Sequence, residues 1–208
     1  MGQQPLADWQ ITSFEELLAH LDGLLEAAWN ADVDPRLARQ LAAIRHRLVR
    51  IQAHLQGQSN PGHPPPRPRH KAVRTNDDLI EQFGAVAEAA RAGRALPMTL
   101  THYLHNARQR LHYFLRSREH RLASRQVPDT GANAILELNG QRHEVAVVDR
   151  SPFGVGVRAE AAVDTEQVAQ LYCPQKADGA KTFECLTVHC RKRKDGYHVG
   201  LEIFTAKR

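Results

Sequence analysis

The chain has 208 residues, 42% of them hydrophobic and 25% charged, with a formal net charge of +5. This composition is typical of a globular protein and leaves room for one large domain or two small ones. The positive charge favours anionic partners, although arginines on helices also form solvated basic faces. The hydrophobic fraction argues against a chain that is disordered throughout.

The start of the chain lacks the pattern of a secretory signal, and no apolar run is long enough to span a bilayer. The three cysteines, Cys173, Cys185 and Cys190, cannot all pair and form no disulfide framework. We therefore expect a cytoplasmic protein without a membrane span, in a reducing compartment.

The first half has the pattern of four helices. A Ser13–Glu16 capping box precedes the first, Asp34-Pro35 begins the second, and Gly57 ends it. The third follows Asn76, and the fourth follows a break at 93–97. Apolar residues recur three and four positions apart at Phe14, Leu17, Leu21, Leu24 and Ala28; at Leu37, Leu41, Ile44, Leu48, Ile51 and Leu55; at Leu79, Phe83, Val86 and Ala90; and at Leu100, Leu104, Ala107, Leu111 and Phe114.

These stripes predict a helical module over residues 1–117, with a proline-rich linker at 58–74. We expect the four helices to form a bundle. The alternative is that one helix pair packs its apolar stripe against another subunit, which leaves a homo-oligomer open.

At about Arg121 the apolar period changes from 3.6 towards two. Six short strands are expected at 134–138, 143–149, 154–160, 167–173, 182–190 and 197–204. Asn139-Gly140 and Asp195-Gly196 are strong hairpin dipeptides. Residues 118–208 therefore predict a small antiparallel six-stranded β-barrel, and the whole chain is of the α+β class.

Polar residues gather where the helices give way to strands. Arg121 and Arg125 are four residues apart, so a helical turn would place both on one side. Guanidinium groups bond bidentately to phosphate or to guanine. Asp149 can accept hydrogen bonds from guanine, Ser151 can bond a phosphate or a base edge, and Gly154 permits a sharp turn and close approach. Together they suit a ligand that is anionic and carries a nucleobase.

The pair Arg121-x-x-x-Arg125 and Asp149-x-Ser151-x-x-Gly154, with the closing strand Tyr-His-Val-Gly-Leu-Glu-Ile-Phe, resembles the PilZ domain family. The resemblance covers about 118–204. It implies a small β-barrel that binds the bacterial second messenger cyclic di-GMP. Arg121 and Arg125 would contact phosphate and guanine, and the other three residues would face the guanine.

Arg150 departs from the family pattern, which usually has an aliphatic residue at this position. Its side chain either projects outward and adds a phosphate contact, or it marks a strand edge that differs from the family. We include Arg150 among the candidate ligand-binding residues on the first interpretation.

The resemblance implies a bacterial signal-transduction protein: a receptor that transmits nucleotide binding at the helix–barrel junction to a partner protein through the helical module. Ordering of the segment around Arg121 on the ligand would reorient the bundle. The alternative is a basic nucleic-acid-binding or oligomerisation protein with a barrel that binds no nucleotide. We expect no cofactor and no enzyme, since no catalytic motif is visible.

Two histidine-containing groups invite comparison with metal sites. His102, His105 and His112 lie on one predicted helix without a carboxylate or cysteine at matched spacing. Cys185, His189 and Cys190 lack the spacing of a zinc site. We expect no metal site at either.

Overall fold

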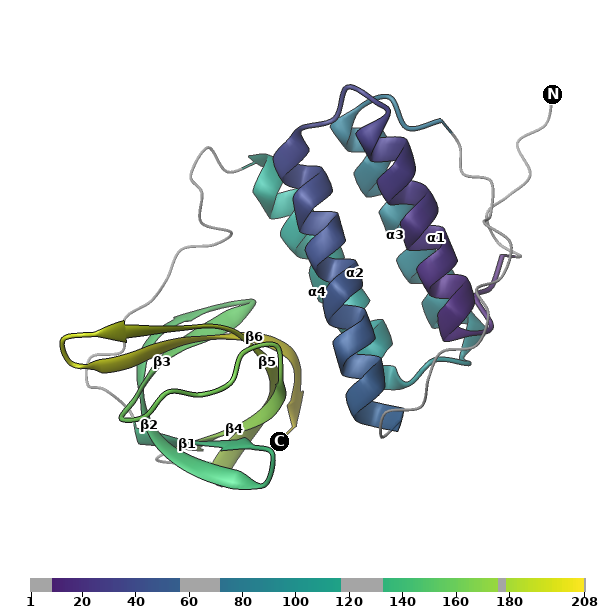
Figure 1. Cartoon of the computed structure of the whole chain (residues 1–208). Coiled ribbons are helices and arrows are strands. Elements are labelled where there is room, and N and C mark those ends of the chain that lie inside the picture. Colours follow the sequence, from purple (N-terminus) through teal and green to yellow (C-terminus); the bar gives the residue numbers. More distant parts are fainter. Residues whose placement is uncertain (1–8, 57–71, 117–132, 176–178, 208) are drawn as a thin grey trace. The chain divides into compact units, whose positions relative to one another are not determined.

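The computed structural model describes residues 9–56, 72–116, 133–175 and 179–207. The chain divides into two compact units, Met1–His120 and Arg121–Arg208. The first unit is helical and the second is a barrel (Figure 1). The expected class, α+β with helices before strands, is confirmed.

The helical unit contains α1 (Phe14–Trp29), α2 (Pro35–Gln56), α3 (Asn76–Gly93) and α4 (Met98–Arg116). Within the described residues, α1 packs against α2 and α3, and α4 packs against the same two helices (Figure 1). Four helices in a square arrangement bury their stripes within one chain. The bundle is therefore closed without a helix pair from another subunit.

Two hydrogen bonds from backbone amides give the directions of the helices. The Asp34 N–H at the start of α2 donates to Asn76 Oδ1 at the start of α3, at 2.8 Å. The Ile11 N–H, before α1, donates to the Ala89 carbonyl near the end of α3, at 3.1 Å. Hence α2 and α3 run parallel and begin at the same end of the bundle, so a short turn cannot join them.

The helix starts differ in detail from the prediction. Ser13 accepts the Glu16 N–H at 3.1 Å, but the Glu16 carboxylate accepts from Thr12, at 2.8 Å from its N–H, rather than from Ser13. A reciprocal capping box instead begins α3, between Thr75 and Asp78. Backbone and hydroxyl donors lower the pKa of the Asp78 carboxyl, with the Arg74 N–H as the largest cause.

The predicted stripes form the bundle core except at two helix ends. Leu55 is expected in the α2 stripe but is 43% exposed, because it lies in the last turn, beyond Ile51, which is fully buried. Phe114, near the end of α4, is half-buried, and the Arg36 guanidinium lies 5.7 Å from its ring centroid. Both residues lie at the end of their helix, where the apolar stripe is only partly covered by the other helices.

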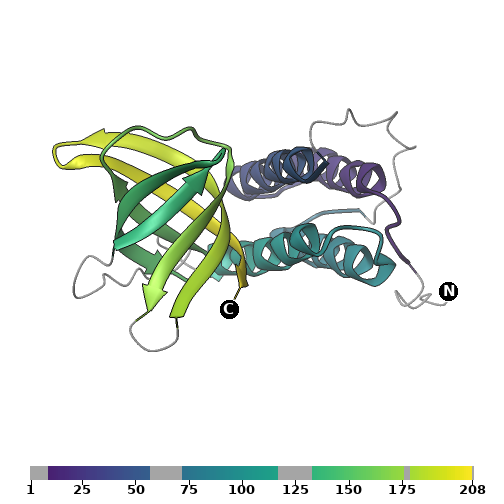
Figure 2. The same cartoon turned by 90° about the horizontal axis from the view of Figure 1, so that it is seen from below.

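The second unit is a closed antiparallel barrel in the order β1-β2-β3-β6-β5-β4, which confirms six strands (Figure 2). Its strands are β1 (Asn133–Leu138), β2 (Gln141–Ser151), β3 (Gly154–Ala159), β4 (Val168–Gln175), β5 (Gly179–Arg193) and β6 (Gly196–Lys207). Alternate residues such as Val145, Val147, Val155 and Val157 fill the interior. The Cys185 thiol is also inside, where burial raises its pKa to about 12.

The two predicted hairpins are present. Asn139 and Gly140 join β1 to β2 with φ values of 51° and 75°, as a primed turn requires. The β5–β6 turn lies one residue earlier than predicted: Arg193 pairs with Gly196, so Lys194 and Asp195 form the turn. Along the described part of the chain, no helix has the length and hydropathy needed to cross a membrane.

Candidate ligand-binding face of the barrel

The hairpin between β2 and β3 brings together three of the predicted site residues. β2 continues through Ser151, Pro152 and Phe153 make the turn, and Gly154 pairs with Ser151. The Ser151 hydroxyl donates to the Gly154 carbonyl at 3.2 Å. The Ile203 N–H donates to the Phe153 carbonyl at 3.0 Å, which ties the turn to β6. The turn is therefore a fixed part of the barrel surface.

A β-bulge decides which way Asp149 points. Val147 pairs with Val157 and faces the interior, and in a regular strand Asp149, two residues on, would do the same. The register shifts between Val147 and Asp149, so Asp149 pairs instead with Gly156. One extra residue in the strand therefore puts the carboxylate on the outer face of the barrel.

The same bulge turns Arg150 the other way. Arg150 pairs with Val155, which belongs to the barrel core, and its guanidinium lies 5.7 Å from the centroid of the Phe183 ring. Lys181 Nζ lies 5.3 Å from the same centroid. The structure thus does not bring Arg150 onto the face that carries Asp149 and Ser151. Its assignment to the ligand stays a prediction from the sequence.

Four residues in register cross the outer face of four strands. Asp149 of β2 pairs with Gly156 of β3, Gly156 with Gly200 of β6, and Gly200 with His189 of β5. We call this set the glycine row. It has an acid at one end, an imidazole at the other, and two glycines between them. The two glycines add no side chain of their own to the row.

The two end groups lie over the glycines. A Cβ on Gly156 would be 2.7 Å from Asp149 Oδ1, and a Cβ on Gly200 would overlap the imidazole of His189. Neighbouring strands are about 4.8 Å apart, so the carboxylate and the imidazole lean toward each other over adjacent strands. Neither position is possible with a side chain at the glycine below it.

His189 and the two glycines were missed from the sequence. His189 owes its position to a second bulge, because the register of β5 against β6 shifts between Thr187 and His189. In a regular strand His189 would share the orientation of Thr187, which pairs with Leu201 of the core. Simple alternation therefore points it inward. The only signal was Gly200, inside the closing Val-Gly-Leu pattern.

A row of two arginines with a histidine between them borders the glycine row on one side. Arg158 of β3 pairs with His198 of β6, which pairs with Arg191 of β5. Asp195 lies 3.2 Å from Arg158 Nη1 and 3.2 Å from His198 Nε2. The hydrogen bond from Arg158, followed by that from His198, lowers the pKa of the Asp195 carboxyl. We call Arg158, His198 and Arg191 the cationic row.

On the other side, Gly154 pairs with Glu202 of β6. The Glu202 side chain is only 7% exposed, although it lies on the outer side of the strand. From the cationic row, the outer face continues through the glycine row to a strip that contains the part-buried Ser151 hydroxyl and the buried Glu202 side chain. Such a face can hold a planar, polar ligand that also carries negative charge.

The other half of the predicted constellation cannot be placed. Arg121 and Arg125 lie in 117–132, outside the described residues. Of the six predicted site residues, the structure brings three together on the β2–β3 hairpin, namely Asp149, Ser151 and Gly154.

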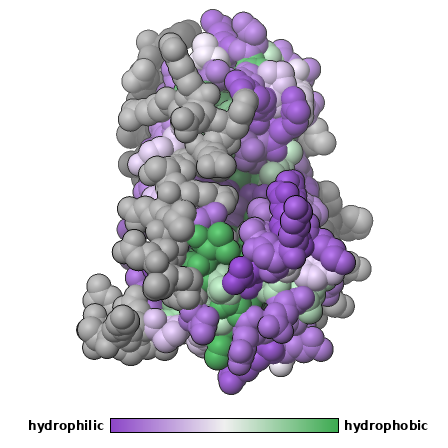
Figure 3. Space-filling model, turned by 90° about the vertical axis from the view of Figure 1, so that its left-hand side faces the viewer, coloured by the Kyte–Doolittle hydropathy of each residue, from purple (hydrophilic) through white to green (hydrophobic). Residues whose placement is uncertain are grey.

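A pocket of about 790 Å³ lies elsewhere on the barrel, against the outer side of β1 and its neighbours. Ile135, Tyr172 and Glu144 line it, together with Arg158 and Asp195 from the edge of the cationic row. It contains no residue of the glycine row. In the view of Figure 3, hydrophilic residues dominate the surface and hydrophobic ones occupy a smaller area.

Neither histidine group is arranged as a metal centre. His105 Nε2 lies 3.0 Å from the Gln109 side-chain amide, one turn along α4. Among the residues that the structure describes, no three His, Cys, Asp or Glu side chains are grouped so that they could hold a metal ion. All three cysteines are free thiols.

No family model matches the chain, and no curated protein matches it.

Two neighbouring glycines give a test of the face. A Cβ on Gly154 would lie 2.5 Å from the Leu201 carbonyl oxygen, which is backbone and cannot move aside. Gly154→Ala should therefore lower the free energy of unfolding of the barrel by about 1–3 kcal/mol. At Gly156 the obstacle is the end of the Asp149 side chain, which can rotate. Gly156→Ala should leave the barrel folded while displacing the carboxylate.

Scanning calorimetry of the full chain measures both variants. We expect the barrel transition to move to lower temperature for Gly154→Ala and to shift much less for Gly156→Ala. Equal losses, or a larger loss for Gly156→Ala, would contradict the geometry of the glycine row.

Proposed function

We propose that the protein is a receptor for cyclic di-GMP, which binds on the outer face of the barrel over the glycine row. The observation that carries the proposal is the register of Asp149, Gly156, Gly200 and His189 across four strands. Ser151 and Gly154 lie in the adjacent row. The motif resemblance to the PilZ family and the six-stranded antiparallel barrel support the same function.

The glycine row suits a guanine base. With no side chain on Gly156 or Gly200, the Asp149 carboxylate and the His189 imidazole can lie over these strands, where both can contact a flat ring. The Asp149 carboxylate accepts hydrogen bonds only, so it matches the ring N–H and the amino group of guanine. Adenine presents a ring nitrogen acceptor in place of that N–H. The His189 imidazole can stack on a base or bond its edge.

The phosphates of the ligand need cations beside the base. Arg121 and Arg125 supply two guanidinium groups four residues apart, and their planar forks match phosphate oxygens. The cationic row, through Arg158 and Arg191, gives the described part of the barrel a matching positive edge. In a dianionic ligand with two guanines, a guanine can bond the Asp149 carboxylate and the phosphates can bond the arginines.

Arg121 and Arg125 lie in the chain between α4 and β1. A ligand bound by these two arginines would therefore alter the conformation of the segment that connects the helical module to the barrel. We propose that this change is what a partner protein reads, as a population shift between two states. A cytoplasmic bacterial protein is the setting in which such a messenger acts.

The first test is calorimetric titration of the full chain with cyclic di-GMP. Micromolar binding corresponds to about −8 kcal/mol, and the loss of one desolvated charged partner costs about 2–5 kcal/mol. Arg121→Ala or Arg125→Ala should each reduce the affinity more than tenfold. Arg142→Ala is the matched control, since Arg142 is an exposed barrel arginine paired with Glu137 at 3.0 Å.

Guanosine monophosphate and cyclic di-AMP are the ligand controls, and both should bind more weakly than cyclic di-GMP. An affinity within twofold of wild type for either arginine variant would remove that residue from the site. Arg150→Ala in the same series decides its assignment: a loss as large as that of Arg121→Ala would place it in the site despite its position beside Phe183.

The second test concerns His189. Stacking of a base on an aromatic side chain contributes about 1–3 kcal/mol, so His189→Ala should reduce the affinity for cyclic di-GMP by about tenfold. His189→Phe keeps the ring and should retain most of the affinity. His143→Ala provides a control on β2, since His143 pairs with Leu136, away from the glycine row. Unchanged affinity in His189→Ala would show that the imidazole takes no part in binding.

A further inference from the structure

The four helices of the bundle separate charge by sign. α2 has five arginines and no carboxylate, and α4 has three arginines, three histidines and no carboxylate. α1 has four carboxylates and no lysine or arginine, and α3 has four carboxylates and one arginine, Arg91. Surface charges of mixed sign are the usual pattern, so this separation needs an explanation.

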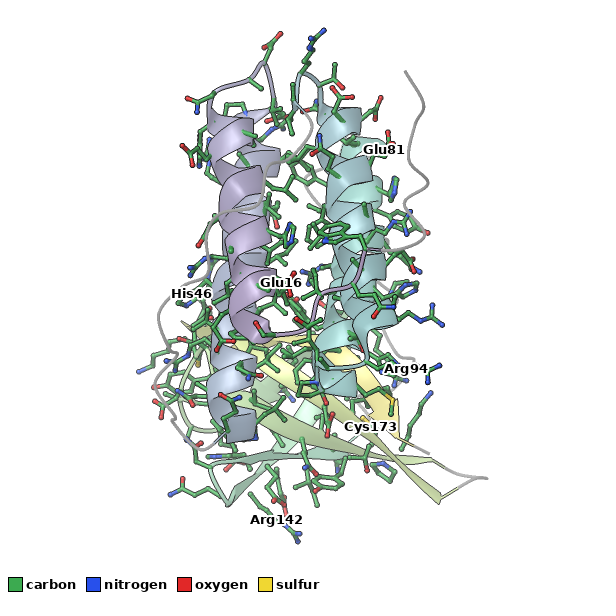
Figure 4. The ribbon with its side chains drawn as sticks, turned by 90° about the vertical axis from the view of Figure 1, so that its right-hand side faces the viewer. Glu16, His46, Glu81, Arg94, Arg142 and Cys173 are labelled. Atoms are coloured by element: carbon green, nitrogen blue, oxygen red, sulfur yellow. The ribbon has the colours of Figure 1, made fainter. Side chains whose placement is uncertain are left out.

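The packing turns this separation into two faces. α2 lies beside α4, and α1 lies beside α3 (Figure 1). The like-charged helices are therefore neighbours. Figure 4 shows His46 on α2 and Glu81 on α3 projecting on different sides of the bundle. We call the outer sides of α2 and α4 the basic face, and those of α1 and α3 the acidic face.

Ion pairs join the two faces along their shared borders. Arg45 Nε lies 2.7 Å from Asp22 Oδ1, between α2 and α1, and Arg108 Nη1 lies 3.0 Å from Glu88 Oε1, between α4 and α3. The centre of the basic face has no carboxylate from its own helices. The exposed arginines and histidines of α2 and α4 are Arg36, which pairs with Asp34, and Arg39, His46, Arg50, His54, His102, His105 and His112.

We propose that the basic face binds the phosphate backbone of duplex nucleic acid. α2 has 22 residues, which at 1.5 Å per residue makes it about 33 Å long, close to the roughly 34 Å of one turn of the duplex. Arginines along a rigid helix can contact phosphates with their forked donors. The acidic face is repelled by phosphate, so only one orientation of the bundle is favourable.

The same observations disfavour an anionic membrane. The most exposed apolar side chains of these two helices lie near helix ends, namely Leu55, Met98 and Tyr113, and the apolar stripes are buried in the core. The described residues of α2 and α4 therefore leave no amphipathic face to enter a bilayer. A second copy of the chain fits by charge, but pairing a basic face with an acidic face is a heterologous contact, which gives a ring or an open filament rather than the common two-fold dimer.

Fluorescence anisotropy with a labelled 24-base-pair DNA duplex tests the proposal, using the full chain between 50 and 200 mM salt. The logarithm of the association constant should fall linearly with the logarithm of salt concentration. In the double variant Arg39→Gln/Arg50→Gln binding should weaken, and the salt slope should fall by about 2, because each arginine that no longer reaches a phosphate lowers it by about 1. Glutamine has a helix propensity close to that of arginine, so the fold is retained.

The matched control is Arg91→Gln/Arg94→Gln, which removes the same charge from the end of α3 and its C-cap. It should keep the wild-type slope. Both double variants should bind cyclic di-GMP like wild type, because the proposed nucleotide site uses other residues. Failure of DNA binding thus leaves the proposed nucleotide function intact.

Several results would overturn the proposal. These are no binding at 50 mM salt, the same salt slope in both double variants, or loss of binding in a Lys192→Gln/Lys194→Gln variant of the β5–β6 hairpin. Equal affinity for phosphatidylserine vesicles would assign the face to a membrane. Salt-sensitive self-association in sedimentation, abolished by Arg39→Gln/Arg50→Gln, would assign it to a second copy.

Discussion

Two β-bulges determine what the outer face of the barrel presents. Each adds one residue to a strand, at Val148 in β2 and at Val188 in β5. Without them, Asp149 and His189 would take interior positions, where an ionised group is costly to bury. With them, both side chains reach the outer face on opposite flanks of Gly156 and Gly200. The proposed messenger site depends on this local change of register.

The fold was largely predictable because burial imposes a period on each element. Stripes such as Leu37–Ile51 and alternating runs such as Val145–Val147 give the helices and strands directly. The motif gave Asp149, Ser151 and Gly154, but not His189, since a bulge is a break in the very period on which the prediction rests. Its neighbour Arg150 shows the converse: adjacency to the motif says nothing about which side of the strand a residue faces.

Both units use charge in the same way. On the barrel, the cationic row lies beside the glycine row, and in the bundle the basic face lies opposite the acidic face. In each case the opposite charge is kept at the border, at Asp195 on the barrel and at Asp22 and Glu88 in the bundle. A net charge of +5 alone would not show this. The arrangement of charge, rather than its sum, gives the protein two surfaces of different shape that suit anions.

The most direct test of the account is a two-dimensional ¹H–¹⁵N NMR titration of the full chain with cyclic di-GMP. If the ligand lies on the glycine row, the backbone amides of Gly156 and Gly200 should shift most, together with those of Asp149 and His189. Amides that line the separate pocket, such as those of Ile135 and Tyr172, should change little. Shifts centred on that pocket, or none at saturating ligand, would contradict the account.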